Sequence, residues 1–262
     1  VPVGKETKYK TLDGRYVEKI KFDSMPEATK WVNEYKHVTN FEYFGNTRHQ
    51  YPFIAEEFEG KIDWDMNQIK MLSLDIECES ENGFPNPEKA DQPLICITVK
   101  DYTTKKIIVF GMGNFVNDRE DVQYINCSTE THLVETFTKF WVEYNPDIIT
   151  GWNVKFFDIP YLMNRFRYLM GDDWLNQFSP WGIVEQRSAA VLFASREQQV
   201  WNIMGVDTLD YLDLYRKFTF VRRESYKLDY IGEVELGENK NENPYDTFKE
   251  FYANDYQKFV EY

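Results

Sequence analysis

Two short motifs carry carboxylates at spacings that suit metal chemistry. The first is Asp75-Ile-Glu77, at the end of an apolar segment that begins near Ile69. Side chains alternate between the two faces of a β-strand, so Asp75 and Glu77 share one face. Carboxylate oxygens are preferred ligands of hard divalent cations. An Asp-x-Glu pair is also common in a solvated edge strand, and that structural explanation stays open.

The second motif is Asn153-Val-Lys-Phe-Phe-Asp158. Asp158 follows a short predicted strand and opens a predicted helix. It is either a functional carboxylate or a helix cap with Pro160 in the first turn. Asn153 could equally be an ordinary turn residue.

Together these motifs resemble the first and second exonuclease motifs of family B DNA polymerases of the T-even bacteriophage type. The resemblance covers the whole chain and extends to residues 7–35, 81–87, 151–161, 209–220 and 225–231. It implies an α/β fold, in which an RNase H-like exonuclease domain has a mixed sheet flanked by helices. A small, partial α+β N-terminal domain would precede it.

The resemblance also implies an activity, the proofreading 3′→5′ exonuclease of a viral DNA-directed DNA polymerase. Two Mg²⁺ or Mn²⁺ ions about 4 Å apart would clamp the attacking and leaving oxygens of the 3′-terminal phosphodiester of DNA. By resemblance, Asp75 bridges the ions, while Glu77 binds the ion that activates water and Asp158 binds the other. Tyr262 would position the attacking water. We expect the three carboxylates to converge on one cleft.

Two further residues are implied in DNA binding, Phe84 and Asn153. Phe84 resembles the residue that stacks on an unpaired 3′ end, although it could also be a packed loop residue. Stacking tolerates any base, so the expected partner is a single-stranded or frayed 3′ end. Residues 184–204 predict a β-hairpin, similar to one that helps to separate primer from template.

The sequence departs from the family pattern at its end. The third exonuclease motif is Tyr-x-x-x-Asp, and the sequence stops at the position of its tyrosine, Tyr262. We therefore expect a piece of a longer polymerase chain that is weakly active or inactive by itself, with the Tyr262 hydroxyl not held in place. The resemblance implies the rest of the polymerase as a partner, with a sliding clamp and RNA as partners of the full-length protein. It places the protein in the cytoplasm of an infected bacterial host.

Two other functions remain open. One is a nucleic-acid-binding regulatory module, an RNA-binding translational repressor without catalysis. The other is a free-standing exonuclease of the same superfamily. Hydrolysis requires a divalent metal and simple binding does not, so metal dependence separates the repressor from the enzymes.

Composition does not decide between these functions. The net charge is −14, from 30 Lys and Arg against 44 Asp and Glu, which is the wrong sign for direct phosphate binding. It fits either a protein without a nucleic-acid partner or an enzyme whose acidic site recruits cations. The three cysteines form no Cys-x-x-Cys pair, which argues against a zinc site or a disulfide framework. No apolar run approaches 18 residues, so no membrane partner is expected.

Periodicity predicts the elements that would position these motifs. We place a domain boundary in the acidic segment 56–66, between an N-terminal domain (1–66) and an exonuclease domain (67–262). The capping box Ser24-Met-Pro-Glu27 predicts a helix to about residue 35. Further strands are predicted at 69–77, 93–100, 105–111, 147–151 and 206–207. Further helices are predicted at 129–144 (capped by Ser128), 158–170, 208–217 and 245–262.

Overall fold

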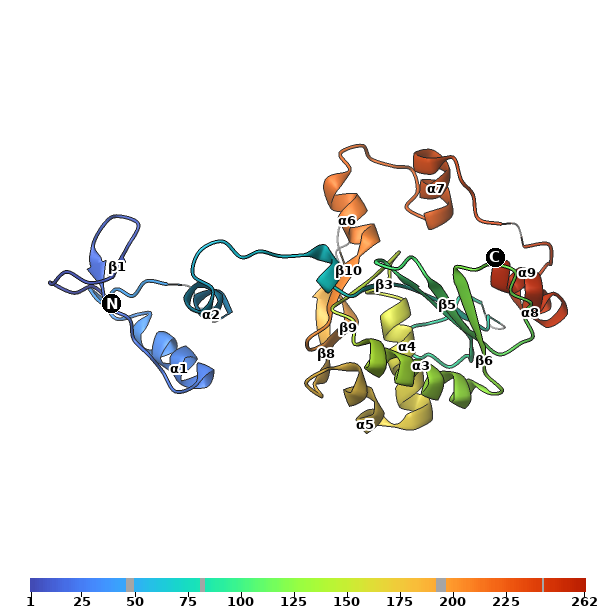
Figure 1. Cartoon of the computed structure of the whole chain (residues 1–262), viewed down its shortest axis with the longest axis horizontal. Helices are drawn as coiled ribbons and strands as arrows, with labels where there is room; N and C mark the ends of the chain where they lie inside the picture. Colours follow the sequence, from blue (N-terminus) through green and yellow to red (C-terminus); the bar gives the residue numbers. More distant parts are fainter. Residues whose placement is uncertain (46–49, 81–82, 192–196, 242) are drawn as a thin grey trace. The chain divides into compact units, whose positions relative to one another are not determined.

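The structure is a computed structural model that describes residues 1–45, 50–80, 83–191, 197–241 and 243–262. The chain divides into two compact units, Val1–Trp64 and Asp65–Tyr262 (Figure 1). This division lies two residues before the predicted boundary at residue 66. In the part of the chain that is described, no helix has both the length and the apolar character needed to cross a membrane.

The first unit has a small cluster of aromatic rings. It contains the antiparallel strands β1 (Tyr9–Lys10) and β2 (Tyr16–Val17) and the helices α1 (Met25–Tyr35) and α2 (Gln50–Glu57). The predicted helix α1 is confirmed, and the Ser24 side chain caps it by accepting a hydrogen bond from the Glu27 amide. The ring of Trp31 packs against four other aromatic rings, those of Phe22, Tyr35, Phe41 and Tyr43.

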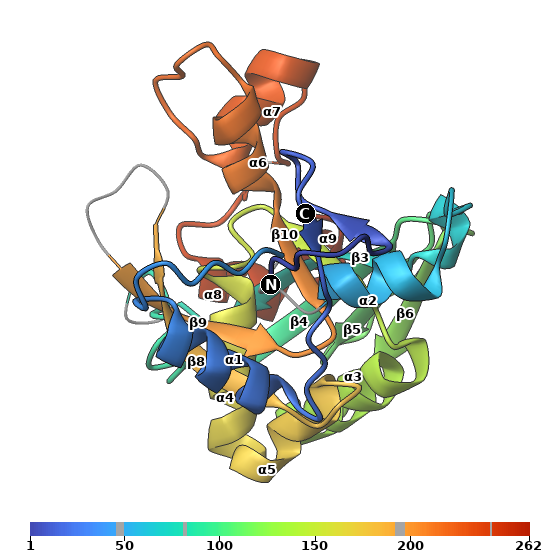
Figure 2. The same cartoon turned by 90° about the vertical axis from the view of Figure 1, so that its left-hand side faces the viewer.

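The second unit is built on a six-stranded mixed sheet with the strand order β10-β7-β3-β4-β5-β6 (Figures 1 and 2). Strands β3, β4 and β5 are antiparallel neighbours, whereas β10 with β7, β7 with β3, and β5 with β6 are parallel pairs. The predicted α/β class is confirmed. The strands are β3 (Met71–Cys78), β4 (Leu94–Asp101), β5 (Ile107–Gly111), β6 (Val122–Asn126), β7 (Ile148–Gly151) and β10 (Asp207–Asp210).

Helices cover both faces of this sheet. On one face, α3 (Glu130–Tyr144), α4 (Asp158–Met170) and α5 (Asp172–Leu175) enclose the main core, which includes Leu72, Leu74 and Ile76 of β3. On the other face, α8 (Phe248–Asn254) and α9 (Tyr256–Glu261) pack on β4, β5 and β6 (Figure 1). Because side chains alternate along β3, Asp75 and Glu77 lie on the face opposite α3 and α4.

Three predicted helix boundaries were wrong. Helix α3 is capped by Thr129 rather than Ser128, because the Thr129 hydroxyl accepts the His132 amide. Residues 208–210 belong to β10, and α6 (Tyr211–Phe218) begins only after Asp210 caps it. The final predicted helix is two helices, since Asp255 adopts a non-helical backbone and its side chain caps α9. Strand β6 and helix α7 (Leu228–Leu236) were not predicted.

A β-hairpin forms where the sequence predicted one. Strands β8 (Val184–Ala190) and β9 (Glu197–Ile203) pair antiparallel, from Val184 opposite Ile203 to Ala190 opposite Glu197. The predicted hairpin also included residues 192–196, which lie outside the described residues. Strand β9 packs against α4, so the hairpin is joined to the main core through Trp201 and Ile203.

Helix α9 is held against the sheet by a tight contact at Gly113. The Tyr256 hydroxyl lies 2.9 Å from the Met112 amide, which donates to it, and 3.2 Å from the Tyr124 hydroxyl. A Cβ atom at Gly113 would lie 2.5 Å from the Tyr256 ring. Only a glycine therefore leaves room for this ring.

We expect Gly113→Ala to destabilise the chain by about 1–3 kcal/mol, the usual cost of overpacking. The added methyl group must push Tyr256, and with it α9, away from the sheet. Urea denaturation measures the free energy of unfolding. Gly4→Ala is the matched control, because a Cβ there meets no atom within 4 Å. Equal stability of the two variants would contradict the proposed contact.

Candidate active site

Asp75 and Glu77 lie in the half of β3 that has only one neighbouring strand. Strand β7 pairs with Met71–Ser73 and then ends, whereas β4 continues beside β3 as far as Cys78. Beyond Ser73, the edge of β3 that faces β7 is therefore open to side chains from elsewhere. The Glu77 side chain is 28% exposed, and Asp75 is more exposed than Glu77.

Asp158 comes to this open edge from the start of α4. Its Oδ1 atom accepts a hydrogen bond of 3.2 Å from the Ile76 amide, and the residue is only 4% exposed. The N-cap of α4 is Phe157, which makes no side-chain capping bond. The interpretation of Asp158 as a helix cap is therefore wrong. Its carboxylate instead joins α4 to the backbone between Asp75 and Glu77.

The pKa values of all three carboxylates are raised in the folded chain. Burial is the main cause for each, and it raises the pKa of Glu77 from 4.5 to about 7. Burial and then repulsion from Asp75 raise the pKa of Asp158 well above its ordinary value. The pKa of Asp75 is raised too, since protein surrounds much of its carboxyl group although solvent reaches the residue. The arrangement therefore concentrates negative charge where water stabilises it poorly.

Lys240 was missed by the sequence analysis, and it is the cation nearest to Glu77 in the described chain. Its Nζ atom lies 3.4 Å from Glu77 Oε1. The only sequence signal was a single lysine within the acidic and Asn-rich stretch 237–243. That stretch reads as a surface loop, so nothing in its pattern points to the cleft.

Tyr262 lies beside Lys240. Its ring centre is 3.8 Å from Lys240 Nζ and 5.5 Å from the centre of the Phe251 ring, and it belongs to the core beneath α8 and α9. The Tyr262 amide donates to the Lys258 carbonyl at 2.9 Å. Aromatic packing therefore holds the Tyr262 ring, whereas the expectation that its hydroxyl is not held in place stays a prediction.

Gly151, the last residue of β7, and Asn153, in the loop that follows, determine the path of the chain from β7 to α4. A Cβ atom on Gly151 would lie 2.6 Å from the Leu74 carbonyl oxygen, so β3 and the loop can approach closely only at a glycine. Asn153 has φ of 65°, in the left-handed region, so it is the turn residue that one interpretation proposed. These features set where Asp158 enters the cleft.

Asp210 anchors the same loop from β10. Its carboxylate accepts the amides of Asn153 at 3.1 Å, Lys155 at 3.0 Å and Leu212 at 2.9 Å, and it is 4% exposed. It therefore caps α6 and holds the second motif at the same time. This agrees with a structural role for Asp210.

We expect Asp210→Ala to destabilise the chain by about 1–3 kcal/mol or more, because buried amides lose their acceptor. Urea denaturation measures the loss. Asp213→Ala is the control, because the Asp213 carboxylate lies 3.8 Å from Lys155 Nζ in a partly exposed ion pair. Such pairs contribute little stability, so the control should lose less than about 1 kcal/mol. A smaller loss for Asp210→Ala than for the control would contradict the anchoring role.

Phe84 and Asn153 line one open cavity of about 500 Å³. The Phe84 side chain is 86% exposed, and its ring centre lies 5.2 Å from that of Phe157. The alternative that Phe84 is a packed loop residue is therefore wrong. The cavity is also lined by Pro85, Asn86, Pro87, Glu88, Phe156, Phe157, Val191, Glu197 and Gln198.

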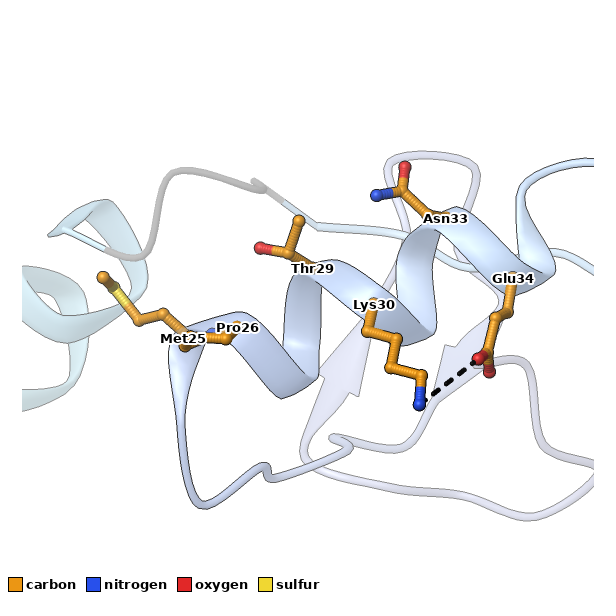
Figure 3. Close-up of a pocket in the computed structure, with 6 residues that line it drawn as sticks. All are labelled: Met25, Pro26, Thr29, Lys30, Asn33 and Glu34. Atoms are coloured by element: carbon orange, nitrogen blue, oxygen red, sulfur yellow. Dashed lines mark ion pairs between the residues drawn. The ribbon is translucent and has the colours of Figure 1, made fainter.

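A second cavity, of about 690 Å³, lies along α1 in the first unit (Figure 3). Its lining residues all belong to this helix, and the Lys30 ammonium lies 4.0 Å from the Glu34 carboxylate. It is a shallow, open surface on one helix.

The donor chemistry of the cleft suits a hard divalent cation, because Asp75, Glu77 and Asp158 offer only carboxylate oxygens. Within the described residues, however, no three Asp, Glu, His or Cys side chains stand close enough together to enclose an ion. Lys240 holds Glu77 instead. The ligand types of these three residues therefore fit a divalent metal ion.

Comparison with known protein families identifies the family of this chain. Residues 29–231 match the profile described as DNA polymerase family B, exonuclease domain. The chain belongs to the family B DNA polymerases. Exonuclease domains of this family are generally metal-dependent. The six-stranded mixed sheet with helices on both faces is consistent with their RNase H-like fold.

Individual family B polymerases align with most or all of the chain at moderate sequence identity. The DNA-directed DNA polymerase of Escherichia phage RB69 is 28% identical over 288 residues, covering 100% of this chain and 31% of that protein. That of Enterobacteria phage T4 is 27% identical over 283 residues, covering 98% and 31%. The DNA polymerase delta catalytic subunit of Candida albicans is 31% identical over 193 residues, covering 68% and 18%. The chain thus spans about a third of its phage relatives.

Proposed function

We propose that the chain is the 3′→5′ proofreading exonuclease region of a bacteriophage DNA polymerase, and that Asp75, Glu77 and Asp158 are its metal ligands. The observation that carries the proposal is the bond from the Ile76 amide to Asp158, which joins the two motifs at the open edge of β3. Family membership supports the same reading. It gives no support to an RNA-binding repressor without catalysis.

Two Mg²⁺ or Mn²⁺ ions held by these carboxylates would stabilise the charge that develops on the reacting oxygens. Hydrolysis adds water across the 3′-terminal phosphodiester and releases a nucleoside 5′-monophosphate and a shortened strand with a new 3′-hydroxyl. The protein supplies no nucleophile. Its own contribution is to bring the carboxylates together at the open edge of β3 and to fix the strand end.

The proposed substrate is a single-stranded or frayed 3′ end. The exposed ring of Phe84 offers a stacking surface that tolerates any base, at about 1–3 kcal/mol for each stacked base. Asn153 lines the same cavity, and its side chain can contact the strand there. We further propose that the chain acts within a longer polymerase, in the cytoplasm of an infected bacterium. Residues 1–64 would form part of its N-terminal domain.

The test is the release of nucleotides from a 5′-labelled DNA strand, with the chain in excess over DNA. Slow shortening from the 3′ end with Mg²⁺ or Mn²⁺, as expected of a weakly active chain, its loss in EDTA and a preference for a frayed over a blunt end are the expected results. Phe84→Ala should weaken binding of the frayed end about 5- to 100-fold, the equivalent of one lost stacking contact. Shortening that persists in EDTA, or tighter binding to a blunt end, would refute the proposal.

A further inference from the structure

Lys240 brings a cation into the group of candidate metal ligands. Its Nζ atom lies 3.4 Å from Glu77 Oε1 and 3.8 Å from the centre of the Tyr262 ring. Its charge also acts on the Asp75 carboxylate. Of the ion pairs between described residues, no other pair includes Asp75, Glu77 or Asp158. Among the described residues, this ammonium is therefore the cation that forms an ion pair with one of these carboxylates.

The surrounding backbone fixes the position of Lys240. Its amide donates to Asp229 Oδ1 in α7 at 2.7 Å, and the next residue, Asn241, donates through Nδ2 to the Glu261 carbonyl in α9 at 3.2 Å. The segment is thus tied to two helices. The lysine side chain is 42% exposed, and its long flexible stem can move while the backbone stays in place.

We propose that the Lys240 ammonium is the resident cation of the metal-free site, where it pairs with Glu77 and competes with the divalent ion that Glu77 binds. This inference rests on the proposed metal-binding role of Glu77. Crowded carboxylates repel one another strongly where solvent screens them poorly, and a nearby ammonium offsets that repulsion. Lys240 therefore stabilises the empty cleft, and it lowers the affinity of the cleft for metal.

The first test compares Mn²⁺ binding to the 262-residue chain and to Lys240→Met, measured as free Mn²⁺ by electron paramagnetic resonance. Without the competing charge, the variant should bind Mn²⁺ at least about fivefold more tightly, at the lower end of usual coupling between two ligands. Lys139→Met, a change at an exposed lysine of α3, should bind as wild type does. Unchanged or weaker binding by Lys240→Met overturns the inference.

The second test is thermal unfolding in EDTA and in saturating Mn²⁺. Ligand binding stabilises the folded state by an amount that grows with the logarithm of the ligand's affinity, so Mn²⁺ should raise the unfolding temperature of Lys240→Met more than that of wild type. If Lys240→Met unfolds at a lower temperature than wild type by the same amount in EDTA and in Mn²⁺, Lys240 is a structural contact only. That result would overturn the inference.

Two further comparisons keep these tests decisive. If Lys240→Met does not fold, Lys240→Gln takes its place, since it keeps a donor for Glu77 without the charge. Lys240→Arg keeps the charge and should not bind Mn²⁺ more tightly than wild type. If the wild-type chain binds no Mn²⁺, the proposed function fails together with the inference. If wild type and Lys240→Met bind Mn²⁺ equally, the inference alone fails.

Discussion

Asp75→Asn should lower metal-dependent release of 3′ nucleotides by more than about 100-fold. Loss of a residue that merely orients a metal ligand typically costs 10- to 100-fold, and a ligand itself should cost more. Asp75 lies on the same face of β3 as Glu77, and its charge also acts on Asp158. In the proposed function it is the carboxylate that both metal ions would share. Asparagine keeps the shape of the side chain and removes the charge that a divalent ion requires.

The measurement is the single-turnover rate on a 5′-labelled strand, with Mn²⁺ binding to the same samples. Asp118→Ala, which removes an exposed acid between β5 and β6, is the control for the change in net charge. Asp75→Asn should lose both hydrolysis and Mn²⁺ binding, whereas the control should keep them. If Asp75→Asn retains more than a tenth of the wild-type rate, Asp75 is not a shared metal ligand.

The metal-free chain should become less stable as the pH rises from 5 to 8. The pKa of Glu77 is about 7 in the folded chain, against an ordinary value of 4.5. Between these values the folded state binds more protons than the unfolded state, so unfolding becomes easier as the pH rises. The difference corresponds to at most about 3 kcal/mol. Burial raises the pKa values of Asp75 and Asp158 in the same direction.

Urea denaturation in EDTA across this pH range measures the effect. Glu77→Gln should be more stable than wild type at pH 8 and should show a flatter dependence on pH. Glu143→Gln, at an exposed position of α3, should follow the wild-type curve. Saturating Mn²⁺ should remove most of the loss at pH 8, because a bound cation favours the charged carboxylates. A wild-type stability that rises from pH 5 to 8 would show that Glu77 is charged in the metal-free fold.

The amino-acid sequence by itself predicted the local elements and the ligand types. Alternation along residues 69–77 placed Asp75 and Glu77 on one face, and the structure has them on the face opposite the main core. Helical spacing and Gly171 gave α4 its bounds, Asp158–Met170. Each of these patterns is visible within a few neighbouring residues, because periodicity and capping act locally.

Contacts between distant segments were decided only by the tertiary structure. From the sequence, Asp158 was also compatible with a helix cap. In the structure, β7 ends before Ile76, so the Ile76 amide has no strand partner and donates to Asp158 instead. Lys240 lies 163 residues from Glu77, in a stretch that reads as a loop. Asp255 interrupts a helical pattern because its side chain caps α9, and Tyr256 then reaches the sheet at Gly113. Burial and pairing across such separations depend on the packed fold, so no local pattern records them.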